Sequence, residues 1–296
     1  MLPPKRIALS GGGMKGISHV GALEILEERG LLKNVKEYIG TSAGALIGFC
    51  ICIGYTLSEL RAICMELDLS LAQNLDPEII MQFLENFGLD DGANTDKLLT
   101  VLLKAKRVDP NITFEEFARQ FPNSPSLRVY AVEIQGCKVH EFSLQKTPRA
   151  ELRMAVRASS SIPIYFTPVY DISLNHVYVD GGLIAHLPFH HLTTEERNET
   201  IGIAFSNSIS EPVEILTFMK YMVKLYYSVY TNQNEQLYND WGHRIIIIPC
   251  GNFPSAYFGA SPSQKECLIN TGREGVLKFL LNPPSNMKKN SRRHSL

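Results

Sequence analysis

Two glycine-rich turns, each between an apolar strand and a helical segment, constrain the fold of this 296-residue chain most strongly. The first has the sequence SGGGMKG at residues 10–16 and follows the apolar strand expected at Arg6–Leu9. The second, GTSAG at residues 40–44, follows a strand expected at 37–40. A strand, a tight turn and a helix in succession are the unit from which parallel sheets are built. The sequence therefore predicts an α/β protein.

The rest of the chain continues this alternation of short apolar runs with helical periodicities. The runs at 201–204 and 245–248 lack polar alternation, as strands buried on both faces do. Further strands are expected at 127–133, 138–142, His176–Asp180, 200–204 and 244–249. Helices are expected over 16–29 and, after the capping box Thr56–Glu59, over 60–67. A second capping box, Thr113–Glu116, indicates another helix, and a last one is expected from the capped Pro262 to residue 280.

One domain is expected over residues 1–284, with the motifs in a core at 6–204 and a mostly helical region at 68–125 inside it. Residues 285–296 carry four bases and no acid, and such a Ser- and Asn-rich tail is expected to be disordered. The alternative is a tail that contacts acidic lipid headgroups. A helical stretch at 212–230 has an apolar face that would cover the sheet or, alternatively, form an apolar rim for acyl chains or a bilayer.

Composition excludes several classes of protein. With 29 Lys and Arg against 30 Asp and Glu, the formal net charge is −1, so no general basic field exists to hold a nucleic acid. The six cysteines form no CxxC pair, which argues against a zinc site and favours a reducing compartment.

The N-terminus resembles no signal peptide. Residues 38–55 carry no charge, but their four glycines favour a buried strand–turn–helix over a membrane span. We expect an intracellular, cytoplasmic protein with peripheral membrane contact.

The first glycine turn is suited to binding an anion. Consecutive glycines let the backbone turn tightly with several N–H groups pointing into one concavity, and the following helix adds the positive end of its dipole. The anion would be a phosphate or a developing oxyanion. A plain glycine turn without a ligand is one alternative. Dinucleotide binding is another, because Gly11, Gly13 and Gly16 match GxGxxG.

The second turn has the features of a nucleophile elbow, which requires a strand before it and a helix after it. Gly40 and Gly44 would relieve crowding in a sharp turn that exposes the hydroxyl of Ser42. The N-terminus of the next helix would lower the energy of negative charge near that hydroxyl. The alternative is a chance match, because GxSxG alone is common.

A third motif, DGG at Asp180, Gly181 and Gly182, ends the strand His176–Asp180. A carboxylate at a strand end, followed by two glycines, can approach another loop closely, although Asp-Gly is also a common β-turn. The three motifs together supply a nucleophile, a set of oxyanion donors and a base. Acyl transfer needs those three roles.

With these motifs, the sequence resembles the patatin-like phospholipase family. GGGMKG, GTSAG, DGG and the stretch AVRASSSIPIYFTPV at 155–169 match that family in order and spacing across residues 6–204. One departure is Ser10, where plant patatins carry Asp before the glycines. The resemblance implies a three-layer α/β/α sandwich with a mostly parallel central sheet.

The resemblance also implies the roles of individual residues. Ser42 would be the nucleophile and Asp180 its acidic partner, in a Ser-Asp dyad without histidine. The oxyanion hole would be lined by Gly11, Gly12 and Gly13, and Lys15 stands where the family places a basic residue. No metal and no cofactor would be required.

Three histidines offer an alternative to the dyad. His186, His190 and His191 follow Asp180, and the order Ser, acid, His is that of α/β-hydrolase triads, so a triad is formally allowed. The alternative is that they are surface or structural residues. His19, on the first helix, is expected to be structural and to lie under the glycine loop.

The leading hypothesis is a lipid acyl hydrolase of the phospholipase A or lysophospholipase type, which cleaves carboxylic esters through an acyl-serine. Its partner would be a lipid substrate, with no nucleic acid. Two alternatives stay open: a non-catalytic nucleotide- or phosphate-binding module that uses the glycine loop, and a catalytically silent lipid-binding relative.

Overall fold

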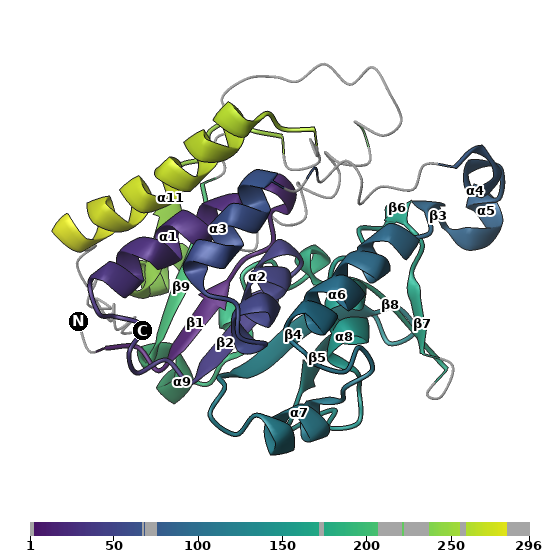
Figure 1. Ribbon diagram of the computed structural model, residues 1–296, viewed down its shortest axis with the longest axis horizontal. Coiled ribbons are helices and arrows are strands. Elements are labelled where there is room, and N and C mark those ends of the chain that lie inside the picture. Colours follow the sequence, from purple (N-terminus) through teal and green to yellow (C-terminus); the bar gives the residue numbers. More distant parts are fainter. Residues whose placement is uncertain are drawn as a thin grey trace, which may run out of the picture.

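The computed structural model describes residues 3–66, 68, 76–171, 175–206, 221, 237–254 and 259–282. Its centre is an eight-stranded sheet (Figure 1). The strands of this sheet are β1 (Arg6–Leu9), β2 (Glu37–Thr41), β4 (Ser126–Glu133), β5 (Lys138–Ser143), β7 (Val169–Asp171), β8 (His176–Asp180), β9 (Thr200–Phe205) and β10 (Ile245–Ile248). A separate two-stranded sheet pairs β3 (Gly88–Asp90) with β6 (Ile164–Phe166).

The order of strands in the large sheet is β10-β9-β1-β2-β4-β8-β7, with β5 paired to β4. The ladder from β10 to β4 is parallel throughout. β5, β8 and β7 form the antiparallel part. The expected mostly parallel sheet is confirmed.

Helical segments cover both faces of the sheet. They are η1 (Gly13–Gly16), α1 (Ile17–Glu28), α2 (Ala43–Cys52), α3 (Leu57–Glu66), α4 (Pro77–Met81), α5 (Phe83–Asn86), α6 (Ala93–Ala105), α7 (Phe114–Gln120), α8 (Leu152–Ser159), η3 (Gly181–Leu183), η4 (Pro188–His191), α9 (Thr194–Asn198), η5 (Gly242–Arg244) and α11 (Pro262–Leu281). The core on one face includes side chains of α1, α2, α3, α6, α8 and α11. On the other face, η4 and residues 237–241 contribute to a second core.

Successive side chains of the parallel strands point alternately into these two cores. In β1, Ile7 and Leu9 join the core with α1 and α2, whereas Ala8 faces the core with η4. In β10, Ile246 and Ile248 face the first core and Ile245 the second. Both faces are apolar because both are covered, which explains the continuous apolar runs in the sequence.

Helix α11 holds α1 in place, and α1 follows the glycine loop directly. The two helices run side by side (Figure 1) and approach closely where each carries a glycine. A Cβ at Gly21 would lie 1.9 Å from the carbonyl oxygen of Ile269, and a Cβ at Gly272 would lie 2.0 Å from that of Ser18. Only glycine fits at either position without a shift of the helices.

The strands expected from sequence agree with the structure to within one residue at each end. Reciprocal hydrogen bonds confirm the capping boxes at Thr56–Glu59 and Thr113–Glu116, and Ser261 caps α11. The charge-free stretch 38–55 forms β2, a turn and α2, as expected. Strands β3, β6 and β7 were missed. The expected features at 212–230, apart from Tyr221, and at 285–296 lie outside the described residues.

Within the described part of the chain, no helical segment combines the length and the apolar character that crossing a bilayer would require.

The close approach of α1 and α11 makes a testable prediction about stability. In an exposed helix, Gly→Ala stabilises by up to about 1 kcal/mol. At Gly272 the new methyl group meets backbone, so we expect Gly272→Ala to lower the free energy of unfolding by about 1–3 kcal/mol. Urea denaturation measures this change. Gly259→Ala is the matched control, because a Cβ there meets nothing within 4 Å. A stabilised Gly272→Ala protein would contradict the packing described.

Candidate active site

The candidate site forms where β2 and β8 meet end to end along one edge of β4. β2 runs parallel to β4 and places Thr41 opposite Tyr130. β8 runs antiparallel to β4 and places Asp180 opposite Ala131. Both strands lie on the edge of β4 that is opposite β5, since the same β4 residues also pair with β5. The carboxyl ends of the two strands therefore meet at consecutive residues of β4, about 3.4 Å apart along the strand.

Ser42 occupies a sharp turn between β2 and α2. Its backbone dihedrals are φ 52° and ψ −122°, in a region that residues with a Cβ rarely adopt. The carbonyl of Ser42 accepts the first hydrogen bond of α2, from the amide of Leu46 (3.0 Å), whereas its hydroxyl does not cap the helix. The hydroxyl therefore lies at the positive end of the α2 dipole without being used to complete the helix.

A second serine supports this strained turn. The hydroxyl of Ser159, at the end of α8, accepts a hydrogen bond from the Ser42 amide (2.9 Å) and donates one to the Tyr130 carbonyl (2.6 Å). Both bonds are buried. Ser159 thus links the turn to β4. It belongs to the 155–169 stretch noted in the sequence, but its role there could not be read from the motif.

The two glycines of GTSAG allow α2 to lie against the sheet. A Cβ at Gly40 would lie 2.5 Å from the Ala45 amide nitrogen, and one at Gly44 would lie 2.3 Å from the Leu9 carbonyl oxygen. Both contacts are with backbone atoms, which can shift only if the strand or helix shifts with them. A side chain at either position would therefore collide with backbone of the turn or of β1.

Asp180 is 1% exposed at the end of β8. Its Oδ1 accepts a hydrogen bond from the Gly182 amide (2.7 Å), and its own amide donates to the Ser161 carbonyl (2.8 Å). A Cβ at Gly181 would lie 2.2 Å from the Tyr130 carbonyl oxygen and 2.9 Å from Cγ2 of Thr41. The DGG turn therefore lies directly against the residue that precedes Ser42.

The glycine loop lies on the other side of Ser42. A Cβ at Gly11 would lie 3.4 Å from Cβ of Ser42. The Gly11 amide donates to the carbonyl of His186 (2.9 Å), so that hydrogen-bond donor is already used. Among the described residues, the amides of Gly12 and Gly13 have no such acceptor. Gly13 has a φ of 52°, which glycine adopts easily.

Two buried histidines lie under this loop. The Nε2–H of His19 donates to the Ser10 carbonyl (2.9 Å), and burial lowers the pKa of His19 to about 4. This confirms the expected structural role of His19. His186 is 6% exposed, and its ring lies 3.3 Å from the position of a Cβ at Gly11. Burial, with smaller effects of His19 and Lys15, lowers the pKa of His186 to about 3.

The remaining predicted residues are Lys15, His190 and His191. Lys15 is half-buried in η1, and burial lowers its pKa. His190 and His191 are exposed, as surface residues would be, and the His191 ring stacks on Tyr130 at 5.3 Å. His186 is therefore the one histidine of the three that the fold brings to the glycine loop. Within the described ranges, no three His, Cys, Asp or Glu side chains gather closely enough to hold a metal ion.

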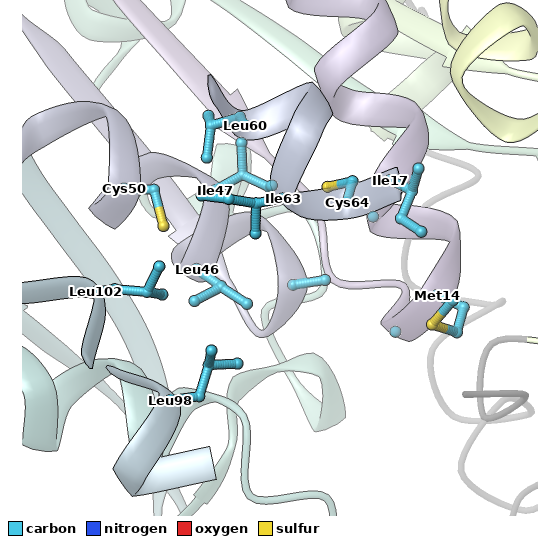
Figure 2. Close-up of a pocket in the computed structure, with 13 residues that line it drawn as sticks. Met14, Ile17, Leu46, Ile47, Cys50, Leu60, Ile63, Cys64, Leu98 and Leu102 are labelled. Carbon is cyan, nitrogen blue, oxygen red and sulfur yellow. The ribbon is translucent and has the colours of Figure 1, made fainter. Parts of the chain in front are cut away.

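An apolar cavity of about 90 Å³ opens beside the turn (Figure 2). It begins at Gly13 and at Ala43, which immediately follows Ser42. Side chains of η1, α1, α2, α3 and α6 line the rest: Met14, Ile17, Leu46, Ile47, Cys50, Leu60, Ile63, Cys64, Leu98 and Leu102. Burial raises the pKa of both lining thiols, that of Cys64 to about 11, so both stay neutral. No sequence pattern indicates this cavity, because its residues resemble ordinary core.

Comparison with known proteins supports one family. A family model described as patatin-like phospholipase matches residues 7–193. A probable lipid hydrolase, 463L of Invertebrate iridescent virus 6, is 32% identical over 185 residues, which are 62% of this chain and 61% of that protein. The cGAMP-activated phospholipase of Vibrio cholerae is 25% identical over 194 residues, which are 62% of this chain and 54% of that protein. The matches span less than two thirds of these two relatives.

The fold has a known counterpart as well. The crystal structure of VipD from Legionella pneumophila superposes with a TM-score of 0.60 at 18% identity, over 95% of this chain and 67% of that one. At this identity the likeness concerns the fold alone, a mostly parallel sheet with helices on both sides. Because the family model covers well over half of the residues, this chain belongs to the patatin-like phospholipase family.

Proposed function

We propose that this protein is a serine hydrolase of lipid carboxylic esters, of the phospholipase A or lysophospholipase type. One observation carries the proposal: β2 and β8 meet on β4, so that the strained Ser42 turn and the buried Asp180 turn lie side by side. Family membership and a relative named as a lipid hydrolase favour this function over the alternatives of a nucleotide-binding loop and a silent lipid-binding protein.

The reaction would proceed in two halves. The Ser42 oxygen attacks the ester carbonyl carbon while Asp180 accepts the hydroxyl proton, and the carbonyl oxygen takes up the negative charge. When the intermediate collapses, Asp180 returns that proton to the departing alcohol and leaves an acyl-serine. In the second half, water attacks the acyl-serine while Asp180 accepts a proton from that water. Asp180 then returns the proton to the Ser42 oxygen, which releases the fatty acid and restores Ser42.

The developing oxyanion would be stabilised by backbone amides. Gly12 and Gly13 are the candidates in the loop, because the Gly11 amide is held by His186. This refines the three-glycine oxyanion hole expected from sequence. The positive end of the α2 dipole at Ser42 would stabilise the same negative charge.

The apolar cavity would hold the acyl chain. It starts at Gly13 and Ala43, beside the proposed oxyanion donors and the nucleophile, and follows α2 to Cys50. Seven residues of helix correspond to about 10 Å. A chain esterified to Ser42 could extend into this space, whereas the departing alcohol would leave by another route.

The dyad is tested by hydrolysis of p-nitrophenyl butyrate and by fatty acid release from phosphatidylcholine. We expect Ser42→Ala to lose roughly 10⁴-fold in kcat and Asp180→Asn to match it within about tenfold, because groups that act as a unit fail together. The control is His186→Asn, which removes the imidazole ring next to Gly11. A folded His186→Asn protein as inactive as Asp180→Asn would replace the dyad with a triad, and an active Ser42→Ala would reject the proposal.

The oxyanion role of the loop makes a separate prediction. A Cβ at Gly12 would lie 2.3 Å from the Phe205 ring, so Gly12→Ala must displace the loop or that ring. We expect kcat to fall by roughly 10²–10³, the effect of losing one oxyanion donor. Phe205→Leu makes room for the methyl group and should restore part of this loss in the double variant. An unchanged kcat in Gly12→Ala would remove the loop from the mechanism.

The acyl cavity is tested by chain length. Leu98→Trp fills the cavity from α6, and we expect kcat/KM for p-nitrophenyl decanoate to fall by roughly tenfold or more while butyrate changes little. The matched control on the same helix is Val101→Trp, which lies outside the cavity at 61% exposure. Equal losses for both esters, or for both variants, would show that the acyl chain lies elsewhere.

A further inference from the structure

Four large apolar side chains are exposed on one small part of the molecule, the tip formed by α4 and α5. Met81 is 87% exposed, Leu84 82%, Phe87 58% and Ile80 44%. Neither helix of the tip has a buried residue. Contiguous exposed apolar groups are unfavourable in water and mark surfaces that are covered in use.

The tip projects from the body of the protein. In Figure 1, α4 and α5 lie beyond β3 and β6, apart from the central sheet. The only formal charges from residue 76 to residue 88 are the acids Asp76, Glu78 and Glu85, and the next base is Lys97. The tip is therefore apolar and mildly acidic.

The backbone at Phe87 is strained in a way that fits an external partner. Phe87 ends α5 with φ 58° and ψ 18°, a left-handed conformation that glycine normally provides. An aromatic residue at this position costs stability, and its side chain gains little from burial within the protein. Strain of this kind is a reason to look for a function.

The tip is connected to the proposed active site by backbone hydrogen bonds. Directly after Phe87, β3 pairs with β6, and the Thr167 amide donates to the Asp90 carbonyl (2.8 Å). The segment before β6 reaches the catalytic carboxylate, because the Ser161 carbonyl accepts the amide of Asp180 (2.8 Å). The buried Arg157 joins the same parts, since it donates to Ser161 and to the Asp91 carbonyl. A contact at the tip would thus be held in a defined position relative to Asp180.

We propose that the α4–α5 tip docks on the surface of an uncharged or zwitterionic lipid layer, with Met81, Leu84 and Phe87 entering the apolar region. The inference rests on the proposed function, which requires the protein to meet an aggregated lipid substrate. Apolar side chains supply the attraction, and the acids of the tip disfavour an anionic surface. This surface differs from the basic tail and the 212–230 helix expected from sequence.

The test compares binding to phosphatidylcholine vesicles by co-sedimentation. We expect Met81→Asp/Leu84→Asp to bind roughly tenfold or more weakly than the wild type, because two apolar groups are replaced by charges. The matched control is Val101→Asp/Leu281→Asp, the same change at positions 61% and 78% exposed outside the tip. We expect the control to bind as the wild type does. Binding of the wild type should not depend on salt, since no ion pair with the headgroups is involved.

A spectroscopic readout accompanies this comparison. The chain has one tryptophan, Trp241, so Leu84→Trp adds a reporter at the tip. Brominated phosphatidylcholine should quench the added fluorescence and leave that of Trp241 in the wild type unchanged. Equal binding of the tip and control variants, or an unquenched reporter, would overturn the proposal. So would a tip variant that binds vesicles normally but loses self-association or a protein partner.

The docking proposal and the proposed function can be disproved separately, because each predicts a different result. If the tip docks on lipid, Met81→Asp/Leu84→Asp loses activity on vesicles and keeps wild-type turnover of soluble p-nitrophenyl butyrate. If the proposed function is wrong, the wild type does not hydrolyse the soluble ester, whatever the vesicles show.

Discussion

The meeting of β2 and β8 on one edge of β4 is the constraint on which the candidate site depends. Thr41 pairs with Tyr130 and Asp180 with Ala131, so two strands that run in opposite directions end at neighbouring residues of a third. The hydrogen-bond ladders with β4 set the positions of both strand ends. The Ser159 hydroxyl and the Gly181 contact with Tyr130 tie both turns to the same stretch of β4.

Burial shapes the electrostatics around this point. The pKa of His19 falls to about 4 and that of His186 to about 3, mainly because burial disfavours the charged ring. Both rings are therefore neutral at neutral pH. In our account, the attraction of the glycine loop for negative charge comes from the backbone amides and helix ends, which need no titrating group.

The central part of the fold could be predicted from sequence, and the outer parts could not. The apolar runs and capping boxes located the parallel strands and helices because those elements are long or carry local signals. β3, β6 and β7 were missed because each has only three residues. β3 and β6 also pair with each other across a long stretch of chain, whereas β7 pairs with the adjacent β8. The exposed apolar residues of α4 and α5 lie in a region that was expected to be helical, but sequence cannot show that they are uncovered.

The same contrast holds for the site. GTSAG and DGG each identified a strand end, because glycine and a polar residue after an apolar run leave a local pattern. Their closeness, with 137 residues between Ser42 and Asp180, depends on β8 running antiparallel along β4. The bond from the Gly11 amide to His186 and the support from Ser159 join distant parts of the chain as well. No spacing rule could show them.

The central claim, that Asp180 activates Ser42, is tested most directly by reaction with an alkyl fluorophosphonate, followed by intact mass and peptide mapping. We expect one phosphonyl group per chain, attached to Ser42, and labelling of Asp180→Asn that is slower by orders of magnitude. Such an adduct needs neither a lipid surface nor knowledge of the natural substrate. A wild-type protein that is not labelled, a label on another residue, or equally fast labelling of Asp180→Asn would contradict the account.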